Sequence, residues 1–295
     1  MSIVKMKKVA VIGFDTAKEK LISDLMELGV VEITDQGQKL LEDEEFKGLG
    51  ERDGDGDKLT AMDFDINRVA VAIDTLEKFS TAKKPLFETR KAMKASEFAK
   101  AMEGREQIQK DIEYVLELNE EHHRLREHIN KKESDLISMK PWLEYDLPME
   151  LDGTQTTSFI LGVVPSTVDM NTLHARTEED SGTVILKEVN RDRDFIYIAA
   201  ISMKEAEDTV QTVFKQHGFT PLPLKGFAGT ASENIERLEA EIEDAKVKLG
   251  ETEKSISEAD SMKFGIQCVY DQMYMERDAE RVKNKLIKTK RTFNL

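Results

Sequence analysis

The chain has 295 residues, of which 39% are apolar, 34% are charged and only 6% are aromatic. This composition is typical of helices with largely solvated surfaces, because a long helix buries only a narrow apolar stripe. The net charge of −15 argues against nucleic-acid binding, since an acidic chain repels phosphate backbones. The single cysteine, Cys268, excludes an intramolecular disulfide.

Neither a secretion signal nor a membrane-spanning segment is expected. The N-terminus lacks an apolar h-region and a cleavage site, and no stretch of about 18 apolar residues occurs anywhere. We therefore expect a soluble, cytoplasmic chain.

Residues 1–65 are predicted to form a first, proximal α/β lobe. Lys8–Phe14 has the length and β-branched content of a strand, and a helix with a leucine stripe follows it. Gly29 should end that helix, and Val30–Ile33 should form a second strand. This βαβ order is found in ferredoxin-like folds. Residues 35–60, which are acidic and contain glycine, are expected to form a mobile loop.

Residues 66–142 are predicted to be the outgoing helices of a rod. A first amphipathic helix begins near Ile66 and ends before Pro85, and a short helical segment follows at Ser96–Met102. From Arg105 to Lys140 one apolar side repeats at helical spacing, which at 1.5 Å per residue gives a helix of about 50 Å.

Residues 143–228 are predicted to form a second, distal lobe of the ferredoxin-like type. The pattern has the order β-α-β-β-α-β. The expected strands are 156–164, 182–189, 194–201 and 219–224, and the expected helices are 167–179 and 204–217.

Residues 229–291 are predicted to be one return helix, from Thr230 to about Lys290, with an apolar heptad repeat and polar interruptions. Its simplest partner is the outgoing helix, running antiparallel, so the distal lobe is an insertion at the tip of a helical hairpin. Residues 292–295 read as the start of a strand. The predicted fold class is therefore α+β and elongated, with two small α/β lobes joined by a long antiparallel coiled-coil rod.

The candidate chemical sites each fail on spacing. A calcium-binding loop counted from Asp53 needs glycine at its sixth position and glutamate at its twelfth, where this chain has Lys58 and Phe64. The three histidines at 122, 123 and 128 lack zinc-ligand spacing. No glycine-rich nucleotide loop is present, and Cys268 has no nucleophile context. We therefore predict no catalytic residue, no cofactor and no metal site. The basic run Arg281–Arg291 is either a solvated helix end or a contact for an acidic partner or an anionic membrane.

The ordered set of motifs resembles the N-terminal cytoplasmic domain of subunit I of V/A-type ATPases, which is called subunit a in eukaryotes. The resemblance covers essentially the whole chain. Its motifs are the opening KMKKVAVIGF with ELGVVEI, then PWLEYDLP at 141–148, the strand FILGVVP ending at Pro165, and the final RTFNL.

The resemblance implies a non-catalytic stator arm on the cytoplasmic side of a membrane complex. The expected partners are peripheral-stalk subunits E and G/H, the central-stalk adaptor subunit, and the family's own C-terminal membrane domain, which this sequence lacks. The chain is thus expected to be a fragment whose proximal lobe either carries an exposed sheet edge or finds a substitute partner for it. In the distal lobe, Arg191 and Arg193 are the candidate stalk-binding residues.

Two other functions stay open at this point. The first is a free-standing coiled-coil regulator whose ferredoxin-like lobes bind small ligands. The second is a structural coiled-coil dimer, which would self-associate strongly.

Overall fold

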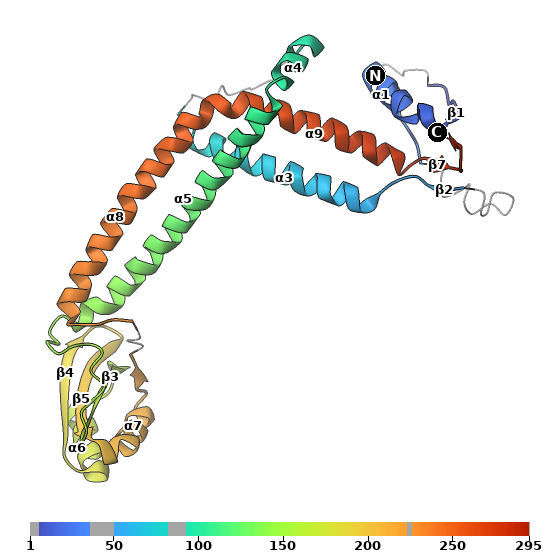
Figure 1. Cartoon of the computed structure of the whole chain (residues 1–295). Coiled ribbons are helices and arrows are strands. Elements are labelled where there is room, and N and C mark those ends of the chain that lie inside the picture. The colour runs from blue at the N-terminus through green and yellow to red at the C-terminus, as the bar shows by residue number, and fades with distance from the viewer. Residues whose placement is uncertain (1–5, 36–49, 82–92, 223–225, 295) are drawn as a thin grey trace. The chain divides into compact units, whose positions relative to one another are not determined.

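The computed structural model describes residues 6–35, 50–81, 93–222 and 226–294 (Figure 1). The chain divides into two compact units, and each is described by itself. The first unit combines residues 1–121 with 252–295, and the second is the continuous stretch 122–251. The fold is a mixture of helices with two four-stranded antiparallel sheets, as the predicted α+β class requires. No helix in the described part of the chain is long and apolar enough to span a membrane.

The sheet of the first unit takes its strands from both ends of that unit. Its order is β1-β8-β7-β2, and every pairing is antiparallel. The strands are β1 (Ile12–Phe14), β2 (Glu51–Arg52), β7 (Ile287–Lys288) and β8 (Thr292–Asn294). After β1 a short 3-10 turn, η1 (Asp15–Ala17), leads into α1 (Lys18–Leu28). Gly29 ends α1 in the left-handed conformation with φ 63°, as predicted.

The predicted second strand at Val30–Ile33 is wrong. These residues are in no strand, and Val30 is 80% exposed. The neighbour that β1 pairs with is β8, some 280 residues later in the chain, so the local βαβ unit does not form. The segment is tethered by a side chain, because Lys285 Nζ donates to the carbonyl of Ile33 at 2.9 Å.

The predicted mobile loop at residues 35–60 is partly wrong as well. Residues 36–49 lie outside the described residues, but Glu51–Arg52 form β2 and a long helix, α3 (Gly56–Phe79), begins within the acidic run. Asp55 caps this helix, because its carboxylate accepts the backbone N–H groups of Asp57 and Lys58 at 3.0 and 3.1 Å. The acidic run therefore starts a helix, ten residues before the predicted one.

The helices of the first unit bury a common apolar core. It contains Leu76 of α3 and Val115 of α5 (Arg105–Met139), both with no exposed surface. The same core contains Ile256 of α8 (Ala231–Glu258) and Ile266 of α9 (Lys263–Lys283). The short helix α4 (Ala95–Met102), where a helical segment was predicted, contributes Met102 to the edge of this core.

The return segment is not one continuous helix to Lys290, as predicted. It consists of α8 (Ala231–Glu258), a 3-10 segment η4 (Ala259–Met262) and α9 (Lys263–Lys283). The chain then turns, because Leu286 and Phe293 bury themselves with Ile22 in a separate small core beneath the proximal sheet. The basic run Arg281–Arg291 thus covers a helix end, β7 and a hairpin turn.

The second unit has the six elements in the predicted order. Its sheet is antiparallel with strand order β4-β5-β3-β6. The strands are β3 (Thr157–Pro165), β4 (Val184–Arg191), β5 (Phe195–Met203) and β6 (Thr220–Pro221), and the helices are α6 (Met170–Ser181) and α7 (Glu207–Gln216). The predicted last strand continues to 224, and residues 223–225 lie outside the described residues.

The two faces of this distal sheet are covered differently. Alternate residues such as Ile160, Ile198 and Ala200 pack on one face against Leu173 of α6 and Phe214 of α7. On the other face, part of the sheet is covered by helical segments at the end of α5 and the start of α8. The residues of this second cluster are Met139, Trp142, Tyr145, Met149, Leu161, Val189, Ala199, Ala231 and Ile235.

Within the second unit, α5 and α8 run antiparallel. Lys132 of α5 lies 2.6 Å from Glu241 of α8, and Glu133 lies 2.8 Å from Lys246. His122 of α5 is only 5% exposed, as expected for a polar residue within the contact between α5 and α8. The coiled-coil geometry and the five-part domain division remain predictions.

Candidate interaction surfaces

Of the two predicted stalk-binding residues, Arg191 is the last residue of β4 and Arg193 lies in the turn between β4 and β5. The guanidinium of Arg191 donates to both carboxylate oxygens of Glu188, at 2.9 and 2.7 Å, and to the carbonyl of Ser166 at 3.4 Å. The bond to Glu188 raises the pKa of Arg191, and the same bond lowers the pKa of Glu188. Arg191 therefore serves first to hold the end of β4.

Asp192 fixes the conformation of this turn. Its carboxylate accepts the backbone N–H groups of Phe195 and Asp194 at 2.7 and 2.8 Å, which lower its pKa, and the hydroxyl of Tyr197 at 2.8 Å. Burial, together with this bond to Asp192, raises the pKa of Tyr197 to about 12. The turn is thus rigidly built, which suits a surface that presents a side chain to a partner.

Arg193 is the residue that this turn presents to solvent. Its backbone carbonyl accepts a bond from Ser166 Oγ at 2.8 Å, and its side chain is exposed. No carboxylate among the described residues lies within ion-pair distance of its guanidinium. Of the two predicted arginines, Arg193 therefore has the charge available for a partner.

The proximal unit exposes a concentration of large apolar side chains near its N-terminal strand. Each of the following is at least 63% exposed: Met6, Val9, Ile12, Phe14, Leu28 and Val30. Among the described strands, β1 pairs with β8 alone, so its other edge is open. Of the two alternatives expected for this lobe, the described residues show the exposed edge.

Half of the basic residues in the run Arg281–Arg291 make side-chain contacts within the chain. Lys283 lies 2.6 Å from Glu19 and 3.1 Å from Glu280, and Lys288 lies 3.3 Å from Asp53. These contacts join α9 and β7 to the N-terminal elements of the unit. These residues are therefore not simply a solvated helix end, and contact of the run with an acidic partner or a membrane stays a hypothesis.

No arrangement in the described part of the chain resembles a catalytic or metal site. The described residues contain no group of three or more potential metal ligands. Asp53 and Asp55, from the acidic run, are engaged with lysines and with the start of α3. Cys268 is buried, and this burial raises the pKa of its thiol, so it lacks the character of a nucleophile.

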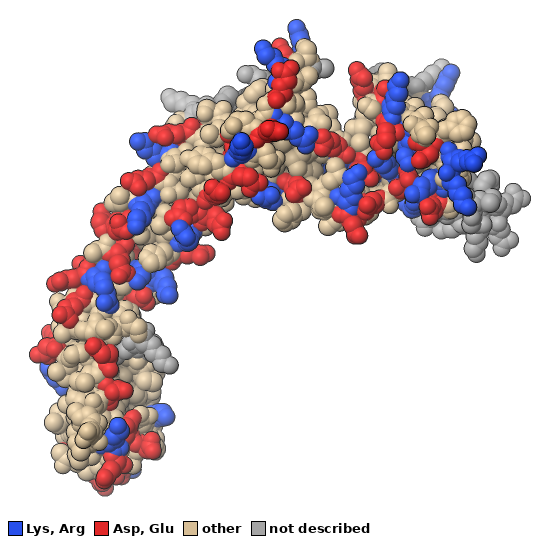
Figure 2. All heavy atoms as spheres, viewed as in Figure 1, with Lys and Arg blue, Asp and Glu red and all other residues tan. Residues whose placement is uncertain are grey.

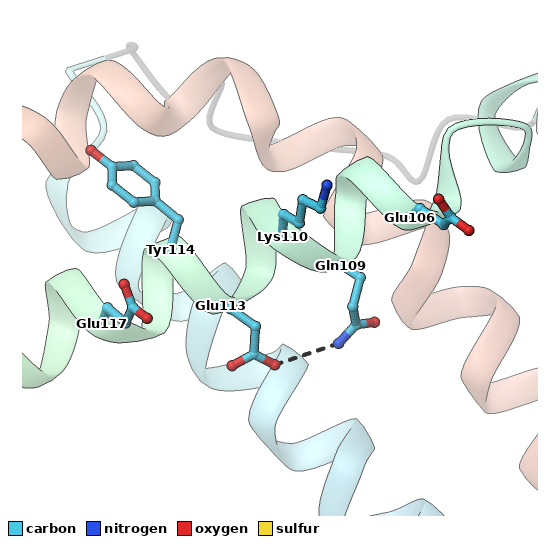
Figure 3. Close-up of a pocket in the computed structure, with 6 residues that line it drawn as sticks. All are labelled: Glu106, Gln109, Lys110, Glu113, Tyr114 and Glu117. Atoms are coloured by element: carbon cyan, nitrogen blue, oxygen red, sulfur yellow. Dashed lines mark hydrogen bonds between the residues drawn. The ribbon is translucent and has the colours of Figure 1, made fainter.

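A depression on the surface of α5 is equally unsuited to chemistry. Figure 3 shows that all its lining side chains come from this single helix: Glu106, Gln109, Lys110, Glu113, Tyr114 and Glu117. Glu113 is paired with Arg68 at 2.7 Å and accepts a long bond from Gln109 at 3.5 Å. An open hollow along one helix does not enclose a ligand, so it offers none of the desolvation that binding sites use.

Comparison with known proteins finds a relative that matches nearly the whole chain. It is 24% identical over 310 aligned residues to A-type ATP synthase subunit I of Methanocaldococcus jannaschii, a match that takes in 98% of the chain. Along its length the chain is similar to subunit I. The expected resemblance is thereby confirmed. The chain spans 44% of that relative, which is thus more than twice as long.

A solved structure is also similar to this chain. It is the cytoplasmic N-terminal domain of subunit I, described as the homolog of subunit a of V-ATPase, with 13% identity and a TM-score of 0.49 over 97% of this chain and 91% of that chain. No family model matches the sequence.

The sequence predicted Arg191 and Arg193 as a pair of partner-binding residues. In the structure the guanidinium of Arg191 binds Glu188, whereas that of Arg193 has no ion pair among the described residues. Sequence reasoning missed the exposed apolar residues of the distal sheet, such as Ile185 and Met203. Their alternation along the strands was visible, but which face other helices cover depends on contacts between segments far apart in the sequence.

Proposed function

We propose that the chain is a cytoplasmic stator arm of a V/A-type rotary ATPase, on the cytoplasmic side of the membrane, without catalytic activity of its own. The observation that carries this proposal is the similarity to A-type ATP synthase subunit I across 98% of the chain. The absence of a catalytic or metal cluster among the described residues is compatible with it.

The arm would act mechanically. A rotary motor delivers torque only if its static parts resist rotation, and packed antiparallel helices resist bending. The ion pairs between α5 and α8, and the apolar core that α3 shares with α9, support such a role. The rod is then a coiled coil, and the distal lobe is ferredoxin-like, which its strand order β4-β5-β3-β6 supports.

The proposed partners are the peripheral-stalk subunits E and G/H, here called the stalk heterodimer, and the central-stalk adaptor. Docking of the stalk on the distal lobe is supported by the rigid β4–β5 turn and by the outward guanidinium of Arg193. The open edge of β1 is the proposed place where further polypeptide of the full-length subunit completes the proximal lobe.

The test is calorimetry between the chain and the stalk heterodimer from the same organism, at moderate salt. Saturable binding is expected, and Arg193→Glu should weaken it several-fold because the charge of a contact residue is reversed. Arg176→Glu, on the exposed surface of α6, is the matched control. Absence of binding at tens of micromolar would contradict the proposed function.

A further inference from the structure

The N-terminal helix α1 is attached to the first unit by very few apolar side chains. Among the eleven described residues of α1, only Lys18 and Ile22 are buried. Ile22 packs against Leu286 and Phe293 in a core with three buried members among the described residues, whereas the core of the distal lobe has eleven. Apolar burial, which stabilises most packed helices, therefore contributes little to holding α1 in place.

Two adjacent residues at the start of α1 carry charges of opposite sign, and each is paired with a different element of the unit. Lys18 meets Asp53, which follows β2, and Glu19 lies 2.6 Å from Lys283 of α9, whose side chain is 13% exposed. We call these two ion pairs the α1 clasp. Asp53 and Lys283 each have a second partner elsewhere in the unit, so both stay charge-paired without α1. Figure 2 shows basic and acidic side chains interspersed over this part of the chain.

Strand β1 also contributes little apolar burial. It pairs with β8 over three residues, and its Ile12 and Phe14 are 75% and 71% exposed. Gly13 is the residue of β1 that faces inward, since a Cβ at this position would lie 2.8 Å from the ring of Phe293. The backbone of β1 therefore covers Phe293 without burying a large side chain of its own.

The rest of the first unit has a core that does not depend on β1 or α1. Leu76 of α3, Val115 of α5 and Ile266 of α9 have no exposed surface and belong to one cluster. Among the described residues, this cluster has no member from β1 or α1. The helices would thus keep their packing if the N-terminal elements moved away.

We propose that residues 12–28, which comprise β1, η1 and α1, are a detachable segment: they open as one unit while α3, α5 and α9 stay folded, and the α1 clasp sets how often they open. Opening uncovers the ring of Phe293 and leaves β8 without its neighbour on one edge. The released helix does not persist, because an isolated helix of this length is marginal in water. Contiguous segments with few buried apolar contacts are the ones that open below the free energy of global unfolding. This inference does not depend on the proposed function.

The test is native-state hydrogen exchange, followed residue by residue in the unaltered chain and in two lysine variants. Lys18→Met removes the buried ammonium group of the clasp. Lys20→Met is the matched control, because Lys20 is an exposed residue of the same helix with no ion pair among the described residues. In Lys18→Met the amides of residues 22–28 should exchange about tenfold faster or more, because Asp53 loses a buried partner. The amides of residues 69–76 in α3 should be unaffected, and Lys20→Met should change neither set.

A second variant addresses the other ion pair of the clasp and keeps the inference testable if Lys18→Met does not fold. Glu19→Gln should accelerate the same α1 amides by about twofold to fivefold, a smaller effect because the Glu19 side chain is 69% exposed. Circular dichroism melts check that each variant is folded. Exchange of the α1 and α3 amides through one common opening in the unaltered chain would contradict the inference. Equal acceleration of both sets in Lys18→Met, or no difference between Lys18→Met and Lys20→Met, would contradict it as well.

Discussion

The ammonium group of Lys18 on α1 lies 2.6 Å from the carboxylate of Asp53, which follows β2, and the two side chains are only 11% and 6% exposed. They form a close ion pair rather than a well-directed hydrogen bond. Burial by itself lowers the pKa of Lys18, but the hydrogen bond to Asp15 and the ion pair with Asp53 outweigh it, so the pKa is raised. Lys288 approaches the other oxygen of Asp53 at 3.3 Å. This arrangement joins the N-terminal helix to β2 and β7.

Asp53→Asn should therefore destabilise the first unit by about 2–3 kcal/mol, because it leaves two buried or half-buried ammonium groups without their shared carboxylate. The measurement is urea denaturation followed by circular dichroism. Lys254→Met is the control, since Lys254 and Glu258 form an exposed pair at 3.8 Å and its loss should cost less than about 0.5 kcal/mol.

The single tryptophan provides a separate signal for the second unit, against which the effect of Asp53→Asn can be compared. Trp142 is fully buried in the second unit, so its fluorescence reports the unfolding of that unit. The fluorescence midpoint should stay unchanged in Asp53→Asn while the circular dichroism transition moves. A matching shift in both signals would contradict the assignment of Asp53 to the first unit's stability alone.

The stability of the first unit should fall in acid through Glu280. Burial by itself raises its pKa, but hydrogen bonds from Lys58 and Lys283 outweigh this, so the pKa lies below the ordinary 4.5. A carboxylate with a lowered folded-state pKa contributes stability that is present above its unfolded pKa and lost as the pH falls through the folded value. Glu280→Gln should therefore be less stable than the unaltered chain at pH 7, with the difference shrinking below about pH 4.5 in thermal melts. A difference that is constant down to pH 3 would contradict this.

Tyr197 should ionise late in alkaline titration. Its pKa is raised to about 12 by burial first and by the bond to Asp192 second, against an ordinary value of 10.0. The ultraviolet difference between the unaltered chain and Tyr197→Phe should therefore titrate near 12. In Asp192→Ala the corresponding pKa should move towards 10 and stay above it, because burial remains. Since the folded-state pKa is raised, the stability from neutral Tyr197 is present below pH 10 and is lost between about pH 10 and 12.

The acidic run Asp53–Asp57 should behave as a helix start and not as a calcium loop. Asp55→Ala removes the acceptor for two backbone N–H groups of α3 and should cost about 1 kcal/mol, while Asp55→Ser should retain most of the stability. Calcium at millimolar concentration should leave the melting temperature of the unaltered chain unchanged. A rise in melting temperature that Asp55→Ala abolishes would favour a calcium site.

Features set by local chemistry could be predicted from the sequence. Gly29 adopts the left-handed conformation that ends α1, Pro141 follows the last residues of α5, and Asp192 forms the turn between two apolar strands. In each case the residue that determines the conformation lies within a few positions of the feature. The six elements of the distal lobe follow the same logic.

Features set by distant contacts could not be predicted. Val30–Ile33 has strand composition, yet β1 pairs with β8 from the other end of the chain. The 3-10 segment Ala259–Met262 contains neither glycine nor proline, so no residue within it predicts the change from α-helical to 3-10 geometry. The exposure of Ile185 likewise depends on the register that places it opposite Ile201 and on which part of the sheet other helices cover.

The mixed origin of the proximal sheet has a consequence for biosynthesis. Its strand β1 is synthesised some 280 residues before its neighbour β8, which contains Phe293. The second unit, by contrast, is one continuous stretch, 122–251, and can form as soon as it is released. The distal lobe should therefore fold first. Until β8 is available the proximal lobe is incomplete, and we expect chaperones to bind its exposed apolar side chains around Ile12 and Phe14 during synthesis.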